Sequence, residues 1–458
     1  MTAPHIRPLM STVAASADAP ARDKPRNLLR VLGAAFAIAI AIGATIGGGI
    51  LRTPGDVAAQ LPSVSLFMIV WVAGGLNALF GATAYAELGT MIPRSGGMYT
   101  FARRAMGDTV GFFVGFLDWL NWSVASAALI LLIGEYLGAV FPALAARATV
   151  TGFAVFTAVV ALQWRGVLWG GRFQEITSVI KTLALAGLVA AVVFLPHAEV
   201  GAATTARAVP TGAALITALA LALQGIVFTY DSYYAVVYCG EEIKDAAKAI
   251  PRSIFRGVLL IIAIYLLVNA AFVAVVPIER MAGDPFVGAT VAKALFGPRG
   301  DTIIRAIMIV SIVGTVNAQI MASPRILHAM SEDGLFPRQA TRVNAGGTPS
   351  TATVLSVLLI GAFLFTGSFN AAIGVDSIFI IVGYVMVLTS LFVLRRREPD
   401  APRPYRAWGY PWIPGLALVF AVVLLGTLVW ADPKSSVITL ALLLLSWPVA
   451  RVIRRWVR

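Results

Sequence analysis

The sequence has very little of the chemistry that enzymes use. It contains one cysteine, Cys239, and three histidines, His5, His197 and His328, in 458 residues. A single cysteine cannot form an internal disulfide, and a metal cluster or a Cys–His catalytic pair has too few residues to draw on. A nucleotide-binding GxxxxGK[ST] loop is also missing from the sequence. These absences argue against an enzyme and against an ATP-driven pump, and we predict no cofactor and no bound metal.

Charged residues are scarce as well. They make up 12% of the chain, against about 25% in a soluble domain, while hydrophobic residues make up 59% and the mean hydropathy is +0.85. This composition predicts an all-α membrane protein that crosses the lipid bilayer many times. The net charge of +13 does not indicate a nucleic-acid partner, because the basic residues lie between the apolar runs.

The apolar runs predict twelve transmembrane helices. They lie near 31–59, 64–90, 109–138, 148–167, 174–195, 211–239, 254–277, 301–330, 350–367, 371–394, 413–431 and 436–456. An even number places both termini on one side. Of the 35 Lys and Arg residues, 26 fall at the termini and alternate connections on that side, eight on the other side, and one within a helix. The positive-inside rule therefore predicts cytoplasmic termini and the inner membrane as the location.

The first apolar segment contains an unusual stretch, GATIGGGI, from Gly43 to Ile50. Each glycine in a helix interior costs about 1 kcal/mol relative to alanine, and Gly47, Gly48 and Gly49 follow one another. Non-helical backbone at membrane depth is tolerated only where it is buried in protein or lines a cavity. We therefore predict a helix that is broken beside a binding site. The alternative is a small-residue packing face, because Gly43 and Gly47 form a GxxxG pair.

The sixth segment is interrupted in a similar way, with Asp231 and Ser232 halfway along QGIVFTYDSYYAVVYCGEE. Two interruptions that lie five helices apart favour a transporter built from inverted repeats. The expected organisation is a cytoplasmic tail (1–28), a first repeat of five helices (29–195) and a second repeat (211–394). Two further helices and a cytoplasmic C-terminus (412–458) complete it.

Several motifs also resemble those of a known family. GATIGGGILRTPG, YAELGTMIPRSGGMYTFARRAMG, EEIKDAAKAIPRSI and RPYRAWGYPWIP occur in the order found in the amino acid–polyamine–organocation superfamily. The resemblance extends over essentially the whole chain beyond residue 30. It implies the leucine-transporter type of fold, with five plus five inverted helices and two more, and the transport of amino acids or related amines.

The two breaks predict complementary halves of a substrate site. A half-helix that starts near Gly49 would present unpaired N–H groups and a positive dipole end to a carboxylate. The resemblance assigns this role to Gly47, Gly48 and Gly49, with the carbonyls near Thr45 and Ile46 facing the amine. At the other break, Asp231 and Ser232 would contribute polar groups, and Phe228, Tyr230, Tyr233 and Tyr234 would contribute aromatic surface or merely pack.

Asp231 is a carboxylate at mid-membrane, which is a functional hypothesis by default. It departs from the resemblance, because neutral amino acid permeases of this superfamily generally have small residues at this break. Three interpretations are open. Asp231 binds the substrate ammonium together with the carbonyl of Phe228, it carries a coupled proton, or it caps the second half of the helix.

Lys181 is the second charge within the predicted membrane segments. Its position matches a lysine of sodium-independent members of the superfamily, whose ammonium occupies the place of a sodium ion in related carriers. Ser311 and Thr315 are the expected partners, and coupling to sodium is disfavoured. The alternatives are a lysine that snorkels to the cytoplasmic face and a lysine whose lowered pKa allows proton coupling.

Other polar residues carry weaker predictions. Asp118, Asn121 and Trp122 would line the pathway or bond neighbouring helices. Glu87, Arg94, Glu241 and Glu242 are expected to form gating ion pairs near the cytoplasmic ends of their helices.

The sequence thus predicts a secondary active amino acid transporter that works by alternating access. Exchange of amino acids and symport with protons both remain open as coupling modes. The first, second, sixth and seventh helices are expected to rock against the rest. The alternatives are an amine or polyamine carrier in which Asp231 binds the ammonium, a channel, and a receptor that binds amino acids without transporting them.

Overall fold

The computed structural model describes residues 28–196, 198, 200–201, 208–364 and 369–457, and within these ranges the protein is helical, without strands. The predicted tail, 1–28, lies almost entirely outside the described residues. The α-helices are α1 (Ala34–Thr45), α2 (Gly49–Gln60), α3 (Val64–Met91), α4 (Met98–Met106), α5 (Asp108–Val140), α6 (Ala148–Arg165), α7 (Val167–Phe194), α8 (Gly212–Tyr230), α9 (Ala246–Val275), α10 (Ile278–Met281), α11 (Val287–Phe296), α12 (Gly300–Glu332), α13 (Ser350–Leu364), α14 (Phe369–Arg397), α15 (Trp412–Ala431) and α16 (Pro433–Val457).

The predicted all-helical membrane fold is confirmed. Eleven helical stretches among the described residues are long and apolar enough to cross a membrane, and α13 is a shorter apolar helix at the position of the ninth predicted segment. Large apolar side chains lie exposed on the outside, for example Phe194 at 82% and Trp412 at 77%. Such exposure fits a surface that lipid covers, because a soluble protein rarely exposes so many large apolar groups.

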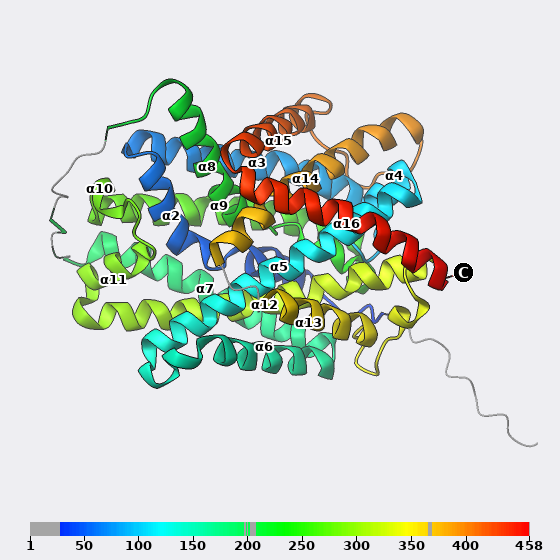
Figure 1. Ribbon diagram of the computed structural model, residues 1–458, viewed down its shortest axis with the longest axis horizontal. Helices are drawn as coiled ribbons and strands as arrows, with labels where there is room; N and C mark the ends of the chain where they lie inside the picture. The colour runs from blue at the N-terminus through cyan, green and yellow to red at the C-terminus, as the bar shows by residue number, and fades with distance from the viewer. Residues whose placement is uncertain (1–27, 197, 199, 202–207, 365–368, 458) are drawn as a thin grey trace, which may run out of the picture.

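Long helices cross in the middle of the bundle. Figure 1 shows α5 and α12 passing through its centre, and these two helices pack against each other. α1 packs between α7 and α9, and α3 packs along α9. α15 and α16 lie together at the periphery, with α16 in front in Figure 1. The centre of the bundle is therefore formed by α1, α5, α8, α12 and their immediate neighbours.

The chain leaves the helical conformation at the glycine-rich stretch. α1 ends at Thr45, Ile46 has φ −73° and ψ 87°, and α2 begins at Gly49. Gly48 precedes α2 without any side-chain cap. The run of three glycines explains why the helix does not continue, because glycine loses more conformational freedom in a helix than any other residue.

The second interruption follows α8. Asp231 has an extended conformation, with φ −64° and ψ 169°, and Ser232 has a positive φ of 74°. A positive φ is uncommon for residues other than glycine. After a turn the chain forms only two short 3₁₀ helices, η2 (Ala235–Tyr238) and η3 (Gly240–Glu242). The α-helical second half that the segment 211–239 predicted is therefore replaced by 3₁₀ turns.

Candidate functional site

A buried cavity lies where the two interruptions meet. The junction of α1 and α2, the end of α8 and the middle of α5, α12 and α14 form its walls. It is lined by Ala44, Thr45, Gly47, Gly48, Gly49, Asn121, Trp122, Ala125, Leu129, Phe228, Thr229, Asp231, Ser232, Thr315, Gln319, Asp376 and Ile380. Most of the predicted substrate residues therefore lie around one space, although they come from distant parts of the sequence.

The start of α2 borders this cavity through Gly48 and Gly49. A Cβ atom on Gly49 would lie 2.7 Å from Thr229 Oγ1, and one on Gly48 would lie 2.8 Å from Leu132 Cδ2. These glycines therefore allow a close approach between the α2 start and its neighbours. The first N–H groups of an α-helix lack partners within the helix, so this end can receive a carboxylate.

Gly43 has a different environment. A Cβ atom there would lie 1.9 Å from Gln174 Nε2 and 2.3 Å from Ser178 Oγ, both on α7. Gly47 instead faces Thr315 and lines the cavity. The packing interpretation therefore fits Gly43, which lets α1 and α7 come close. It does not fit Gly47, which lines the cavity.

Lys181 does not snorkel to the membrane surface. Its side chain is buried, and Nζ donates to the carbonyl oxygens of Ile46 at 2.7 Å, Gly43 at 2.8 Å and Ser311 at 2.9 Å. Thr315 Oγ1 lies 3.2 Å from the same nitrogen. The ammonium of α7 thus joins the interruption after α1 to α12. Buried charges are tolerated where hydrogen bonds of this kind replace water.

The carbonyls at the end of α1 already have donors from the protein. Ile46 O accepts from Lys181 Nζ, from Ser311 Oγ at 3.0 Å and from Thr315 Oγ1 at 3.2 Å. Thr45 O accepts from Tyr265 Oη at 3.0 Å. Ile46 also does not line the cavity. The expectation that the Ile46 carbonyl faces a substrate amine therefore does not match the geometry, because its lone pairs are occupied.

Asp231 lines the cavity and is held by hydroxyl groups. Its carboxylate accepts from Ser232 Oγ at 2.9 Å and Tyr234 Oη at 2.8 Å, and Tyr384 Oη of α14 lies 3.3 Å away. The α-helix that Asp231 was expected to cap is absent here. The 3₁₀ helix η2 follows instead; it begins after Tyr234, and no side chain caps it. The capping interpretation is therefore wrong in its α-helical form.

Aromatic residues near the second interruption mostly pack. The predicted site residue Tyr230 does not line the cavity; its ring lies against Trp71 and Tyr265, at centroid distances of 5.9 and 5.0 Å. Tyr234 stacks on Tyr85 at 4.1 Å. Of the four aromatic residues predicted near this interruption, Phe228 reaches the cavity.

The sequence prediction overlooked Asp376 on α14. Its side chain is 2% exposed and lines the cavity. With the Asn121 amide oriented so that its nitrogen faces α14, that nitrogen lies 2.8 Å from Asp376 Oδ1 and 3.2 Å from the Asp376 carbonyl oxygen. The sequence does contain a signal for it, because a lone carboxylate within the apolar segment 371–394 indicates a functional residue.

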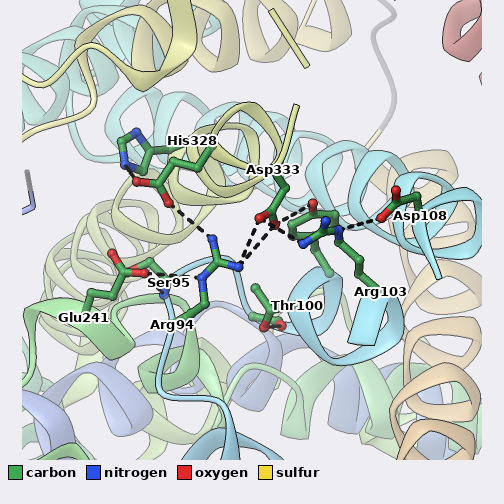
Figure 2. A network of polar contacts seen from close by, with 11 residues as sticks. Arg94, Ser95, Thr100, Arg103, Asp108, Glu241, His328 and Asp333 are labelled. Atoms are coloured by element: carbon green, nitrogen blue, oxygen red, sulfur yellow. Dashed lines mark hydrogen bonds and ion pairs between the residues drawn. The ribbon is translucent and has the colours of Figure 1, made fainter. Parts of the chain in front are cut away.

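The basic end of the bundle, which carries the connections 92–97, 333–349 and 398–411, is tied by ion pairs. Figure 2 shows Arg94 between the acidic groups of two elements: its guanidinium lies 3.1 Å from Asp333 Oδ1 and 3.8 Å from Glu241 Oε1. Arg103 of α4 reaches the same Asp333 oxygen at 2.9 Å. Burial alone would lower the pKa of Arg94, but the neighbouring carboxylates, first of all Asp333, raise it.

Three deeper ion pairs, centred on two carboxylates, lie behind this network. Arg325 of α12 pairs with Glu242, and both side chains are at most 2% exposed. Glu87 of α3 accepts from Arg395 at 2.7 Å and from Arg403 at 3.0 Å. The four residues predicted to form ion pairs near the ends of their helices all do so, and the connections at this end are closely joined.

A helical membrane protein with a polar cavity between interrupted helices has the architecture of a small-molecule carrier. Residues 32–446 match the model of the amino acid permease family, and the chain belongs to that family. It is therefore a multi-pass membrane transporter and not an enzyme, and its family transports amino acids.

The similarity to curated relatives covers 80% or more of their lengths. The serine/threonine exchanger SteT of Bacillus subtilis (strain 168) is 27% identical over 434 residues, which cover 92% of this chain and 96% of the relative. The branched-chain amino acid permease BcaP of the same organism is 28% identical, with 88% and 89% covered. The human large neutral amino acids transporter small subunit 2 is 27% identical, with 92% and 80% covered.

Proposed function

We propose that the protein is a secondary active amino acid transporter that works by alternating access. The observation that carries the proposal is the cavity that both helix interruptions line, with an uncapped helix start on one side and a carboxylate on the other. An amino acid has the complementary pair of charges a short distance apart. Membership in a family of amino acid transporters supports the same conclusion.

The carboxylate of the substrate is placed at the start of α2. Gly48 and Gly49 border the cavity there, and the helix dipole adds favourable potential. The ammonium is placed on the opposite side, near Asp231 and Phe228. Ser232 and Tyr234 donate to Asp231, so its side chain is held in a fixed orientation before substrate arrives.

Lys181 is proposed to supply the fixed positive charge of the coupling site, with Ser311 and Thr315 as its partners. Its ammonium joins the α1 interruption to α12. Without it, a bound cation would be needed to interact with the carbonyl oxygens that the interruption leaves outside helical hydrogen bonds. This argues against sodium coupling. Exchange of one amino acid for another is supported by the similarity to a serine/threonine exchanger, and symport with protons is the second mode.

The orientation and the repeats are part of the proposal. The excess of Lys and Arg in alternate connections favours the inner membrane with both termini cytoplasmic. The interruptions after α1 and α8 favour two inverted repeats, 29–195 and 211–394, and the first two helices of each repeat are expected to rock against the rest of the bundle.

A ligand screen tests the function directly. Thermal stability of the full chain is measured with amino acids and amines, and uptake into proteoliposomes is then measured with and without a proton gradient. We expect amino acids to stabilise the protein and to be transported. Ligand binding without movement would indicate a receptor, and fluxes far above carrier turnover without stimulation by substrate on the far side would indicate a channel.

Carboxyl-blocked amino acids separate an amino acid carrier from an amine carrier. Methyl esters keep the ammonium but lose the negative charge that the α2 start would bind. We expect them to compete at least tenfold more weakly than the free acids in an uptake assay. Equal competition would show that no carboxylate is bound and would favour the amine carrier, in which Asp231 takes the ammonium.

Replacing Asp231 with asparagine tests the ammonium site. The variant keeps an acceptor for Ser232 and Tyr234 but loses the negative charge. Because a hydrogen bond to a charged group contributes about 1.5–3 kcal/mol, the affinity for amino acids is expected to fall about tenfold or more, measured by competition binding. A change in thermal stability alone, with unchanged affinity, would reduce Asp231 to a structural role.

A further inference from the structure

The cavity described above has an unbalanced charge. The described residues that line it include two carboxylates, Asp231 and Asp376, but no lysine, arginine or histidine. Both aspartates are buried, at 6% and 2% exposure. Removing a carboxylate from water is costly, and a positive charge nearby stabilises its ionised form. The lining itself does not supply that charge.

Lys181 cannot balance both groups. Its ammonium donates its hydrogens to the carbonyl oxygens of Gly43, Ile46 and Ser311, and Lys181 itself does not line the cavity. A substrate whose side chain is neutral carries one positive and one negative charge and adds none in total. A substrate with a second cationic group adds one positive charge, which makes the sum of the two aspartates, Lys181 and the substrate zero.

Asp376 lines the cavity from a different element than the predicted ammonium site. It belongs to α14 and contacts Asn121 of α5, whereas Asp231 follows α8. With the substrate carboxylate and ammonium proposed to lie at the α1 and α8 interruptions, the lining from α5 and α14 is left for the substrate side chain. Trp122 on α5 also lines the cavity, and an aromatic face favours a cation nearby.

We infer that Asp376 determines specificity and that the site takes amino acids with a side-chain ammonium or guanidinium group. The inference rests on the proposed function and adds to it the class of substrate. Asn121 positions the carboxylate through its amide, and Asp376 pairs with the cationic end of the substrate.

The test uses pairs of similar size that differ in charge. Competition binding to the full chain, reconstituted in proteoliposomes, compares arginine with citrulline and lysine with norleucine. We expect each cationic member to bind at least tenfold more tightly than its neutral counterpart. Equal binding within a pair, or binding of none of the four, would overturn the inference and leave amino acid transport standing. The proposed function fails separately, if no amino acid in the ligand screen is bound and transported.

Asp376→Asn then identifies the residue responsible. The ratio of arginine to citrulline affinity is expected to fall at least tenfold, while citrulline affinity changes less than twofold. Asp118→Asn is the matched control, since Asp118 is also buried but binds Tyr238 Oη at 2.9 Å and does not line this cavity; its ratio should not change. If Asp376→Asn keeps the ratio but makes neutral amino acid uptake independent of the proton gradient, Asp376 carries a proton and the inference is wrong.

Discussion

Replacing Lys181 with alanine is expected to reduce net amino acid uptake to background while the protein remains folded. The substitution removes the ammonium that donates to Gly43 O and Ile46 O, and with it the positive charge that Lys181 brings to the α1 interruption. The carbonyl of Ile46 keeps hydroxyl donors from Ser311 and Thr315, so the fold around the interruption retains hydrogen bonds. Uptake into proteoliposomes and thermal stability in detergent measure the two effects separately.

Lys248→Ala is the matched control for this experiment. Lys248 is exposed near the start of α9, so its loss removes the same side chain and charge from a position outside the bundle core. Its uptake should stay close to that of the wild type. Transport by the Lys181 variant at the same rate as this control would contradict the coupling role.

Replacing Glu242 with alanine is expected to cause the largest loss of stability. The buried Arg325 would keep its charge but lose the carboxylate that accepts hydrogen bonds from its Nε and Nη2. Breaking a buried ion pair by removing one partner costs about 3–5 kcal/mol. We expect a marked fall in melting temperature and in the yield of folded protein, measured in detergent.

A double variant, Glu242→Leu with Arg325→Met, tests the physical reason. It removes both buried charges, so a large part of the lost stability should return. Glu241→Ala is the control, because Glu241 is 30% exposed and pairs with Arg94 at 3.8 Å. Exposed pairs contribute about 0–1 kcal/mol. Equal destabilisation by the Glu241 and Glu242 variants would refute the explanation.

Much of the fold could be predicted because apolar length dominates in a membrane. The segment predicted at 64–90 is α3, Val64–Met91, and the one at 413–431 is α15, Trp412–Ala431. The interruptions could be located because three glycines and Asp231 are improbable within membrane helices. The repeat boundaries, by contrast, stay a prediction.

The details of the site could be predicted only in part. Thr229 lines the cavity and its neighbour Tyr230 does not, because the rotation of α8 depends on what packs around it. The partners of the Ile46 carbonyl come from α7 and α12, far away in sequence. Asp376 was overlooked because its importance comes from its position beside the α1 and α8 interruptions, which the segment 371–394 does not reveal by itself.

Glu87 has a consequence for how the bundle moves. It joins α3 to the end of α14 through Arg395 and, through Arg403 and the backbone N–H of Ala407, to the connection between α14 and α15. Breaking these three hydrogen bonds to a buried carboxylate costs several kcal/mol. We therefore expect α3 and α14 to move together, so that a tilt of α3 shifts Asp376 at the cavity wall and Tyr384 beside Asp231.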